Sequence, residues 1–150
     1  PAEEFAAAAA ANFVPADRSQ GFITPTLVTT GSEVILFDTG LDAAGVTAAL
    51  AAAGHAPGDV THVVLTHMHP DHIGGLTDDA GTATFANAAY ITGRAEFDFW
   101  AGASNEGFEA KVRPLAERMT FLEDGGSLRG GITAVAAPGH TPGHMAYMVE

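Results

Sequence analysis

Three histidines and an aspartate fall within six positions of the segment THMHPDHIGG, so this stretch holds three of the seven histidines of the chain. In extended backbone, residues two apart point to the same side, and His67 and His69 can therefore direct both imidazoles to one point. Pro70 fixes a turn, after which Asp71 and His72 follow in a tight bend. Four donors are too many for one tetrahedral ion that also takes ligands from elsewhere. The segment therefore predicts a site for two metal ions.

A second histidine loop, PGHTPGH, follows the apolar run 132–136. We predict His140 as a further ligand, because a histidine from a distant part of the chain adds the third protein ligand to a site that otherwise has two. His144 starts an alternating apolar run, and we expect it in the core or behind a ligand that it orients. Two other interpretations of the first segment remain, a polar surface loop and an adventitious surface tract that binds zinc or nickel. Neither accounts for the second loop.

The composition limits the kind of site and of partner. The chain has 150 residues and no cysteine, so a metal must be held by nitrogen and oxygen atoms, and a thiolate nucleophile is excluded. The formal net charge is −12, which disfavours nucleic acid as a partner. Basic residues are dispersed along the chain, at Arg18, Arg94, Lys111, Arg113, Arg118 and Arg129.

The length and the apolar content, 47% of the residues, predict one globular domain over residues 1–150. No apolar run reaches the roughly 20 residues that span a bilayer, so we expect a soluble protein with no membrane partner. The chain starts with Pro1 rather than methionine, and its alanine-rich start lacks the basic region of a signal peptide. The compartment stays open between the cytoplasm and, if an upstream signal was removed, the periplasm.

Short elements alternate along the chain and deliver the histidine loops from strand ends. The run His62–Leu65 predicts a buried strand that leads directly into THMHPDHIGG, and strand ends are where an α/β sheet usually places its chemistry. Asp42 is the candidate N-cap of a helix that ends before Gly54. We also expect helices at 1–13, 94–100 and 108–119, strands at 22–30, 33–37, 83–85, 89–92, 132–136 and 145–150, and turns at 31–32 and 124–131.

Three motifs, LFDTG, THMHPDHIGG and PGHTPGH, resemble those of the metallo-β-lactamase superfamily of metal-dependent hydrolases and follow the family's order over Leu36–His144. The spacing from His72 to His140 is similar to that of the lactonase and glyoxalase II-like branches. The resemblance implies an α/β fold, namely the amino-terminal portion of an αββα sandwich. It also implies a centre of two metal ions, usually zinc, at one edge of the sheets, with iron or manganese as alternatives.

Carried over to this sequence, the resemblance implies two sets of metal ligands: His67, His69 and His140 for the first ion, and Asp71 and His72 for the second. In such enzymes a hydroxide that bridges the metals attacks a carbonyl. The aspartate at the position of Asp71 orients this hydroxide and can take up a proton, so Asp71 is the expected catalytic residue. Asp38 would lie behind the ligands and position them, and an aspartate that simply caps a turn is the alternative.

The family's site also needs a bridging aspartate and a further histidine after the second histidine loop, where this sequence offers only Glu150. We therefore expect the domain to be incomplete at its C-terminus. The rest would be missing or supplied by another chain, and a homo-oligomer is one such arrangement. With these residues alone, three histidines would hold the first ion, whereas the second ion would have two protein ligands and bind weakly.

The leading hypothesis is hydrolysis of an ester-like carbonyl in a small molecule, a lactone or a thioester. A β-lactam is less favoured, because some β-lactamase classes hold the second metal with a cysteine and this chain has none. The aromatic residues Phe97, Phe99, Trp100 and Phe108 could line an acyl pocket or pack in the core. Three alternatives remain: a nuclease on the same fold, an iron protein that reduces oxygen, and a non-catalytic metal-binding half-domain that works by association. The charge disfavours the first, and no flavin module supports the second.

Overall fold

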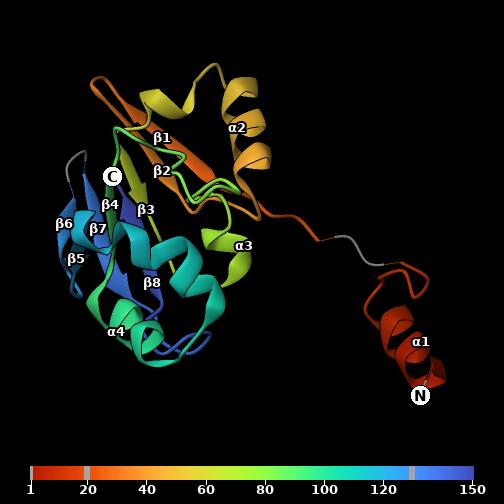
Figure 1. Ribbon diagram of the computed structural model, residues 1–150. Coiled ribbons are helices and arrows are strands. Elements are labelled where there is room, and N and C mark those ends of the chain that lie inside the picture. Colours follow the sequence, from red (N-terminus) through yellow and green to blue (C-terminus); the bar gives the residue numbers. More distant parts are fainter. Residues whose placement is uncertain (1, 19–20, 129–130) are drawn as a thin grey trace.

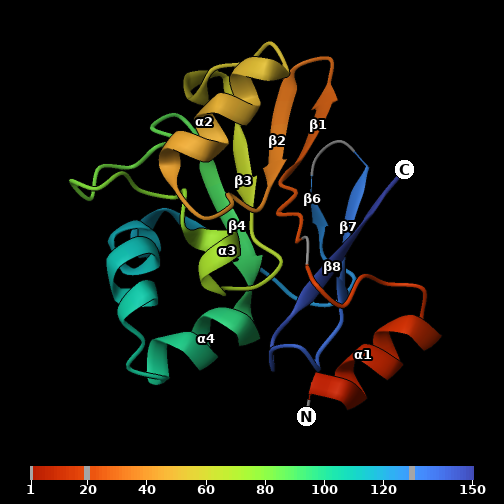
Figure 2. The same cartoon turned by 90° about the vertical axis from the view of Figure 1, so that its right-hand side faces the viewer.

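The structure is a computed structural model that describes residues 2–18, 21–128 and 131–150 (Figure 1). Pro1 of the expected first helix and Arg129 and Gly130 of the expected turn lie outside the described residues. Two sheets face each other, and helices cover the outer face of the larger one (Figures 1 and 2). The predicted α/β class is therefore confirmed.

The larger sheet has five strands in the order β1-β2-β3-β4-β5 and carries the first histidine segment. β1 (Thr26–Thr30) and β2 (Glu33–Phe37) form an antiparallel hairpin across the predicted turn. β2, β3 (His62–Val64), β4 (Ala89–Gly93) and β5 (Met119–Leu122) run parallel. Parallel strands bring their carboxyl ends to one edge, so the segments that follow β2, β3 and β4 meet there.

The smaller sheet is antiparallel, in the order β6-β7-β8, and carries the second histidine loop between its last two strands. Its strands are β6 (Ser127–Leu128), β7 (Ile132–Ala136) and β8 (Met145–Val149). Ile132 and Tyr147 pack against Ile35, Phe37 and Val64 of the larger sheet. This apolar contact holds the two sheets together and brings the second loop to the edge where the first one lies.

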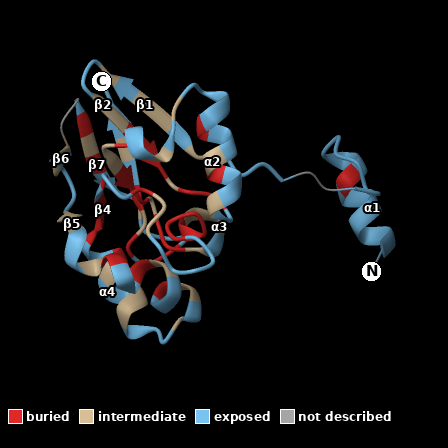
Figure 3. Cartoon of the chain, turned by 45° about the horizontal axis from the view of Figure 1, so that its top comes forward, coloured by how far each residue is buried: buried red, intermediate tan, exposed pale blue. Residues whose placement is uncertain are grey.

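Helices pack on the other face of the larger sheet and form a second apolar core. This layer comprises α2 (Ala43–Ala52), α4 (Arg94–Gly102), η2 (Phe108–Val112) and η3 (Arg113–Arg118). Asp42 caps α2 as predicted, because its carboxylate accepts a hydrogen bond from the Gly45 amide at 2.7 Å. Buried residues concentrate in the strands and on the inner sides of these helices (Figure 3).

Four predicted elements are corrected. The turn expected at 124–131 contains a two-residue strand, β6, which pairs with β7. The helix expected over 108–119 is a π-helical turn followed by a 3-10 helix, because Pro114 has no N–H to donate along a continuous helix. Met119, the last residue of that expected helix, instead begins β5. Residues 83–85 make one isolated bridge, from Ala83 to Thr77, rather than a strand. The first strand begins at Thr26 and not at residue 22, since Pro25 cannot donate a hydrogen bond to the sheet.

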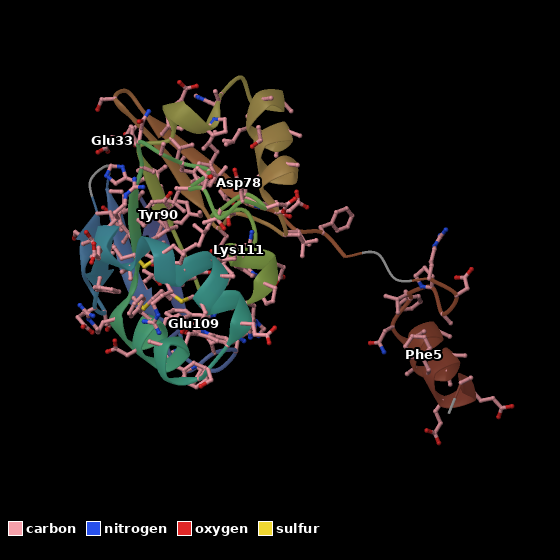
Figure 4. All side chains as sticks on the ribbon, viewed as in Figure 1. Phe5, Glu33, Asp78, Tyr90, Glu109 and Lys111 are labelled. Carbon is pink, nitrogen blue, oxygen red and sulfur yellow. The ribbon has the colours of Figure 1, made fainter. Side chains whose placement is uncertain are left out.

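The amino-terminal helix α1 (Ala2–Ala11) lies apart from the two sheets, and its Phe5 side chain points into solvent (Figures 1 and 4). Two short helices complete the described chain, η1 (Pro57–Asp59) and α3 (Pro70–Ile73), and α3 contains the Asp71 and His72 positions. Within the described part of the chain, every helix is too short or too polar to cross a lipid bilayer.

Candidate metal centre

Three histidine side chains from the two loops converge at one edge of the sheets. His67 Nε2 lies 3.1 Å from His69 Nδ1, and His69 Nδ1 lies 3.0 Å from His140 Nε2. Each residue offers one ligand atom to a group in which all such atoms lie within 4.8 Å of one another. The structure thus brings together the three residues predicted for the first metal. Their role as ligands stays a prediction.

The protonation of His67 suits a cation site. His67 is buried, and burial is the largest cause that lowers its pKa to about 4, followed by the nearby His72, His144 and His69. The imidazole is therefore neutral at neutral pH and keeps a lone pair on one ring nitrogen. A set of three nitrogens held this close, with a neutral member, fits zinc, which prefers imidazole ligands.

The tautomer of His67 is fixed by a chain of hydrogen bonds from Asp38. The Thr66 hydroxyl donates to Asp38 Oδ2 at 2.8 Å, so its oxygen is left to accept the Nδ1–H of His67, 3.0 Å away. Protonation on Nδ1 places the lone pair on Nε2, which is the atom that faces His69. The structure therefore places Asp38 next to His72 and, through Thr66, next to His67, and its role in positioning metal ligands stays a prediction.

Asp71 and His72, predicted for the second metal, lie next to the three-histidine group. His72 donates from Nδ1 to Asp38 Oδ2 at 2.8 Å, and this hydrogen bond is the main cause that raises the His72 pKa. His72 Nε2 faces Asp71 Oδ2 at 3.4 Å, and the Asp71 side chain is 46% exposed. The rings of His67 and His72 are 3.9 Å apart between centroids. The arrangement offers one imidazole nitrogen and one exposed carboxylate beside the first group.

The turn after β2 holds these residues in place by close backbone contact. Asp38 adopts a left-handed conformation, with φ 58°, which is uncommon for a residue other than glycine and often occurs at functional sites. Thr39 donates to the His72 carbonyl from both its amide and its hydroxyl, at 2.8 Å each. A side chain at Gly74 or Gly75 would overlap the backbone of residues 39–42. This glycine pair therefore lets the first histidine segment lie directly against the turn after β2.

His144 is half-buried, with its ring 4.8 Å from that of His67, and it lies beside the three-donor group rather than in it. Burial and then His140 lower the pKa of His144. Phe97, Phe108 and Trp100 all contribute to the core on the helix side of the larger sheet, and an acyl pocket stays a prediction. Phe97 and Phe108 pack together in the core at 5.3 Å, whereas the Trp100 ring stands 5.5 Å from His69.

Two residues of the centre were not predicted from the sequence. Thr66 precedes His67 within the quoted motif, and a hydroxyl at that place could have been read as a partner for the neighbouring imidazole. Glu96 lies in α4, outside both histidine loops, and accepts hydrogen bonds from each of them. Nothing in the local sequence distinguishes Glu96 from an ordinary acidic residue in the first turn of a helix.

Comparisons with known proteins agree with this geometry. The sequence pattern of the metallo-beta-lactamase superfamily matches residues 18–149. The N-acyl homoserine lactonase AttM of Azorhizobium caulinodans is 34% identical over 117 residues, which are 71% of this chain and 42% of that protein. The thioesterase pkgB of Emericella nidulans is 34% identical over 126 residues, 83% of this chain and 31% of that protein.

A solved structure of AidC, described as a dizinc quorum-quenching lactonase in complex with a homoserine product, superimposes with a TM-score of 0.83 at 26% identity. The match covers 100% of this chain and 60% of AidC. This chain spans between 31% and 42% of the length of the curated relatives described as lactonases and thioesterases. With the pattern, the fold and the relatives in agreement, the chain belongs to the metallo-beta-lactamase superfamily.

Proposed function

We propose that this chain carries the metal site of a zinc-dependent hydrolase. Its substrate is a small molecule with an ester-like carbonyl, a lactone or a thioester, and water attacks that carbonyl. The observation that carries the proposal is the convergence of three imidazole nitrogens, within 4.8 Å of one another, from loops 71 residues apart. Relatives described as lactonases and thioesterases support the substrate class.

The residues divide into those that hold a cation and those that handle a proton. His67, His69 and His140 would hold the first ion, and a bound zinc ion would supply the positive charge that lowers the pKa of a water toward about 7. Asp71 reaches solvent, so it can accept a proton from the water that attacks the carbonyl. Asp38 keeps His72 oriented, with Nε2 directed toward Asp71.

The second ion would take one nitrogen from His72 and one oxygen from Asp71 among the residues described. Two protein ligands hold zinc far more weakly than three imidazoles. We therefore propose one tight and one weak zinc site for a chain of this sequence.

Hydrolysis of a small panel tests the proposal. An acylated lactone, a thioester and a β-lactam are incubated with the zinc-loaded protein, and Asp71→Asn is assayed beside it. Turnover of the lactone or the thioester that falls with Asp71→Asn supports the proposal. Zinc binding without turnover of any substrate would favour the metal-binding half-domain instead. Cleavage of structured RNA that a chelator abolishes would favour a nuclease.

A further inference from the structure

Glu96 is a fully buried carboxylate in the first turn of α4 that accepts four hydrogen bonds. Oε1 accepts the Met68 amide at 2.9 Å and the Trp100 indole N–H at 2.6 Å. Oε2 accepts the Thr141 hydroxyl at 2.6 Å and the Gly143 amide at 3.1 Å. All four partners donate, so each carboxylate oxygen accepts two hydrogen bonds.

Three of the four partners of Glu96 are immediate neighbours of the histidines in the sequence. Met68 stands between His67 and His69, while Thr141 directly follows His140 and Gly143 directly precedes His144. One oxygen of the carboxylate therefore holds the first histidine loop, and the other oxygen holds the second loop. The two loops belong to different sheets, and their relative position decides whether three imidazoles can meet.

We propose that Glu96 is a positioning residue for the metal centre: its carboxylate joins the two histidine loops by hydrogen bonds to residues adjacent to His67, His69 and His140. The proposal rests on the proposed metal site, which it deepens. Residues that orient metal ligands raise the affinity for the metal, because a side chain that is already held in place loses little conformational entropy when the metal binds.

The second histidine loop packs directly against the backbone around Glu96. A side chain at Gly143 would overlap the Glu96 backbone nitrogen, so the second loop lies directly on the start of α4. No arginine or lysine within residues 2–18, 21–128 and 131–150 forms an ion pair with Glu96, and the four donors are what compensate its burial. Loss of one oxygen therefore leaves donors of one loop without an acceptor.

Trp100 links this carboxylate to a metal-site histidine and provides a reporter. It is the one tryptophan of the sequence, its indole N–H donates to Glu96, and its ring lies edge-on to His69. Its fluorescence therefore reports the surroundings of both residues, with and without metal.

The test uses Glu96→Gln, with Glu117→Gln on the surface as the matched control, and Thr141→Val, with Thr84→Val as its control. The amide of Glu96→Gln must turn its NH2 group toward one pair of donors, so one loop loses its acceptor. Thr141→Val removes one donor from the second loop only, whereas Thr84 has a buried hydroxyl with no partner among the described residues.

Zinc affinity is measured by competition with a chromophoric chelator, and amide hydrogen exchange is measured on the metal-free chain. We expect Glu96→Gln to raise the zinc Kd about 10- to 100-fold and Thr141→Val to raise it by a smaller factor. In Glu96→Gln we also expect a shifted Trp100 emission and faster exchange of one amide, that of Met68 or that of Gly143, depending on which pair of donors the NH2 group faces. The two controls should match the unaltered chain.

A zinc Kd in Glu96→Gln equal to that of Glu117→Gln, with only a lower free energy of unfolding, would make Glu96 merely structural and overturn the proposal. If Glu96→Gln does not fold, Thr141→Val decides, and a zinc Kd equal to that of Thr84→Val would overturn it. If the unaltered chain binds no zinc, the proposed function fails. The exchange of the Met68 and Gly143 amides then still shows whether Glu96 joins the loops.

Discussion

Asp38→Asn tests the hydrogen bonds behind the metal site. The Asp38 carboxylate accepts three hydrogen bonds at 2.8 Å, from the Thr66 amide, the Thr66 hydroxyl and His72 Nδ1. An asparagine offers one oxygen and one NH2 group in the same place. Whichever way the amide turns, its NH2 group faces a donor, either the Thr66 amide or His72 Nδ1.

The expected loss in the free energy of unfolding follows from these three hydrogen bonds. Asp38 is only 14% exposed, so solvent replaces little of what is lost. A hydrogen bond to a charged group contributes about 1.5–3 kcal/mol and one between neutral groups about 1 kcal/mol. One lost bond and two weakened ones lower the free energy of unfolding by about 3 kcal/mol. The zinc Kd should rise about 10- to 100-fold, because His67 and His72 lose the partner that orients them.

Urea unfolding of the metal-free chain and chelator competition for zinc measure the two effects. Asp98→Asn is the matched control, since Asp98 is 62% exposed and its nearest ion pair, to Arg94, is 3.8 Å long. This control should change stability by less than about 0.5 kcal/mol. If Asp38→Asn lowered neither stability nor zinc affinity beyond Asp98→Asn, the reasoning about the hydrogen-bonded support of the histidines would be refuted.

Two further predictions concern packing and pH. Gly75→Ala should lower the free energy of unfolding by about 1–3 kcal/mol, because a methyl group would overlap the Thr39 carbonyl, and an unchanged urea midpoint would contradict the close backbone approach. Burial raises the pKa of Tyr147 above its ordinary value, so the unfolded chain releases this proton first as the pH increases. Stability that is fully present below about pH 10 should therefore fall above it. The fall should be smaller in Tyr147→Phe, and equal falls from pH 9 to 11 would show that Tyr147 does not cause it.

The histidine motifs could be predicted from the sequence, whereas the residues that hold the two histidine loops in place could not. His67 and His69 share one direction because of strand periodicity, and the short strand before them is visible as an apolar run. The turn after Phe37 and the glycine pair at 74–75 were also predictable, because turn residues and glycines carry local signals. These features depend on few neighbours along the chain.

Features that depend on distant contacts could not be predicted from one sequence. The convergence of His140 on His69 was expected from the motif, but its 3.0 Å approach depends on how two sheets pack. The role of Glu96 depends on donors up to 47 residues away. The helix expected over 108–119 failed for a local reason, since Pro114 interrupts it although the apolar spacing is helical.

The central claim, that His67, His69 and His140 form a zinc site, is tested most directly by the zinc content of the chain. Zinc-equilibrated protein is dialysed against a weak chelator and analysed for metal, beside His69→Ala and the control His55→Ala, a histidine outside the site. We predict one retained zinc ion per chain in the unaltered protein and in His55→Ala, and a loss of that ion in His69→Ala. No retained zinc in the unaltered chain, or equal retention in His69→Ala, would contradict the account.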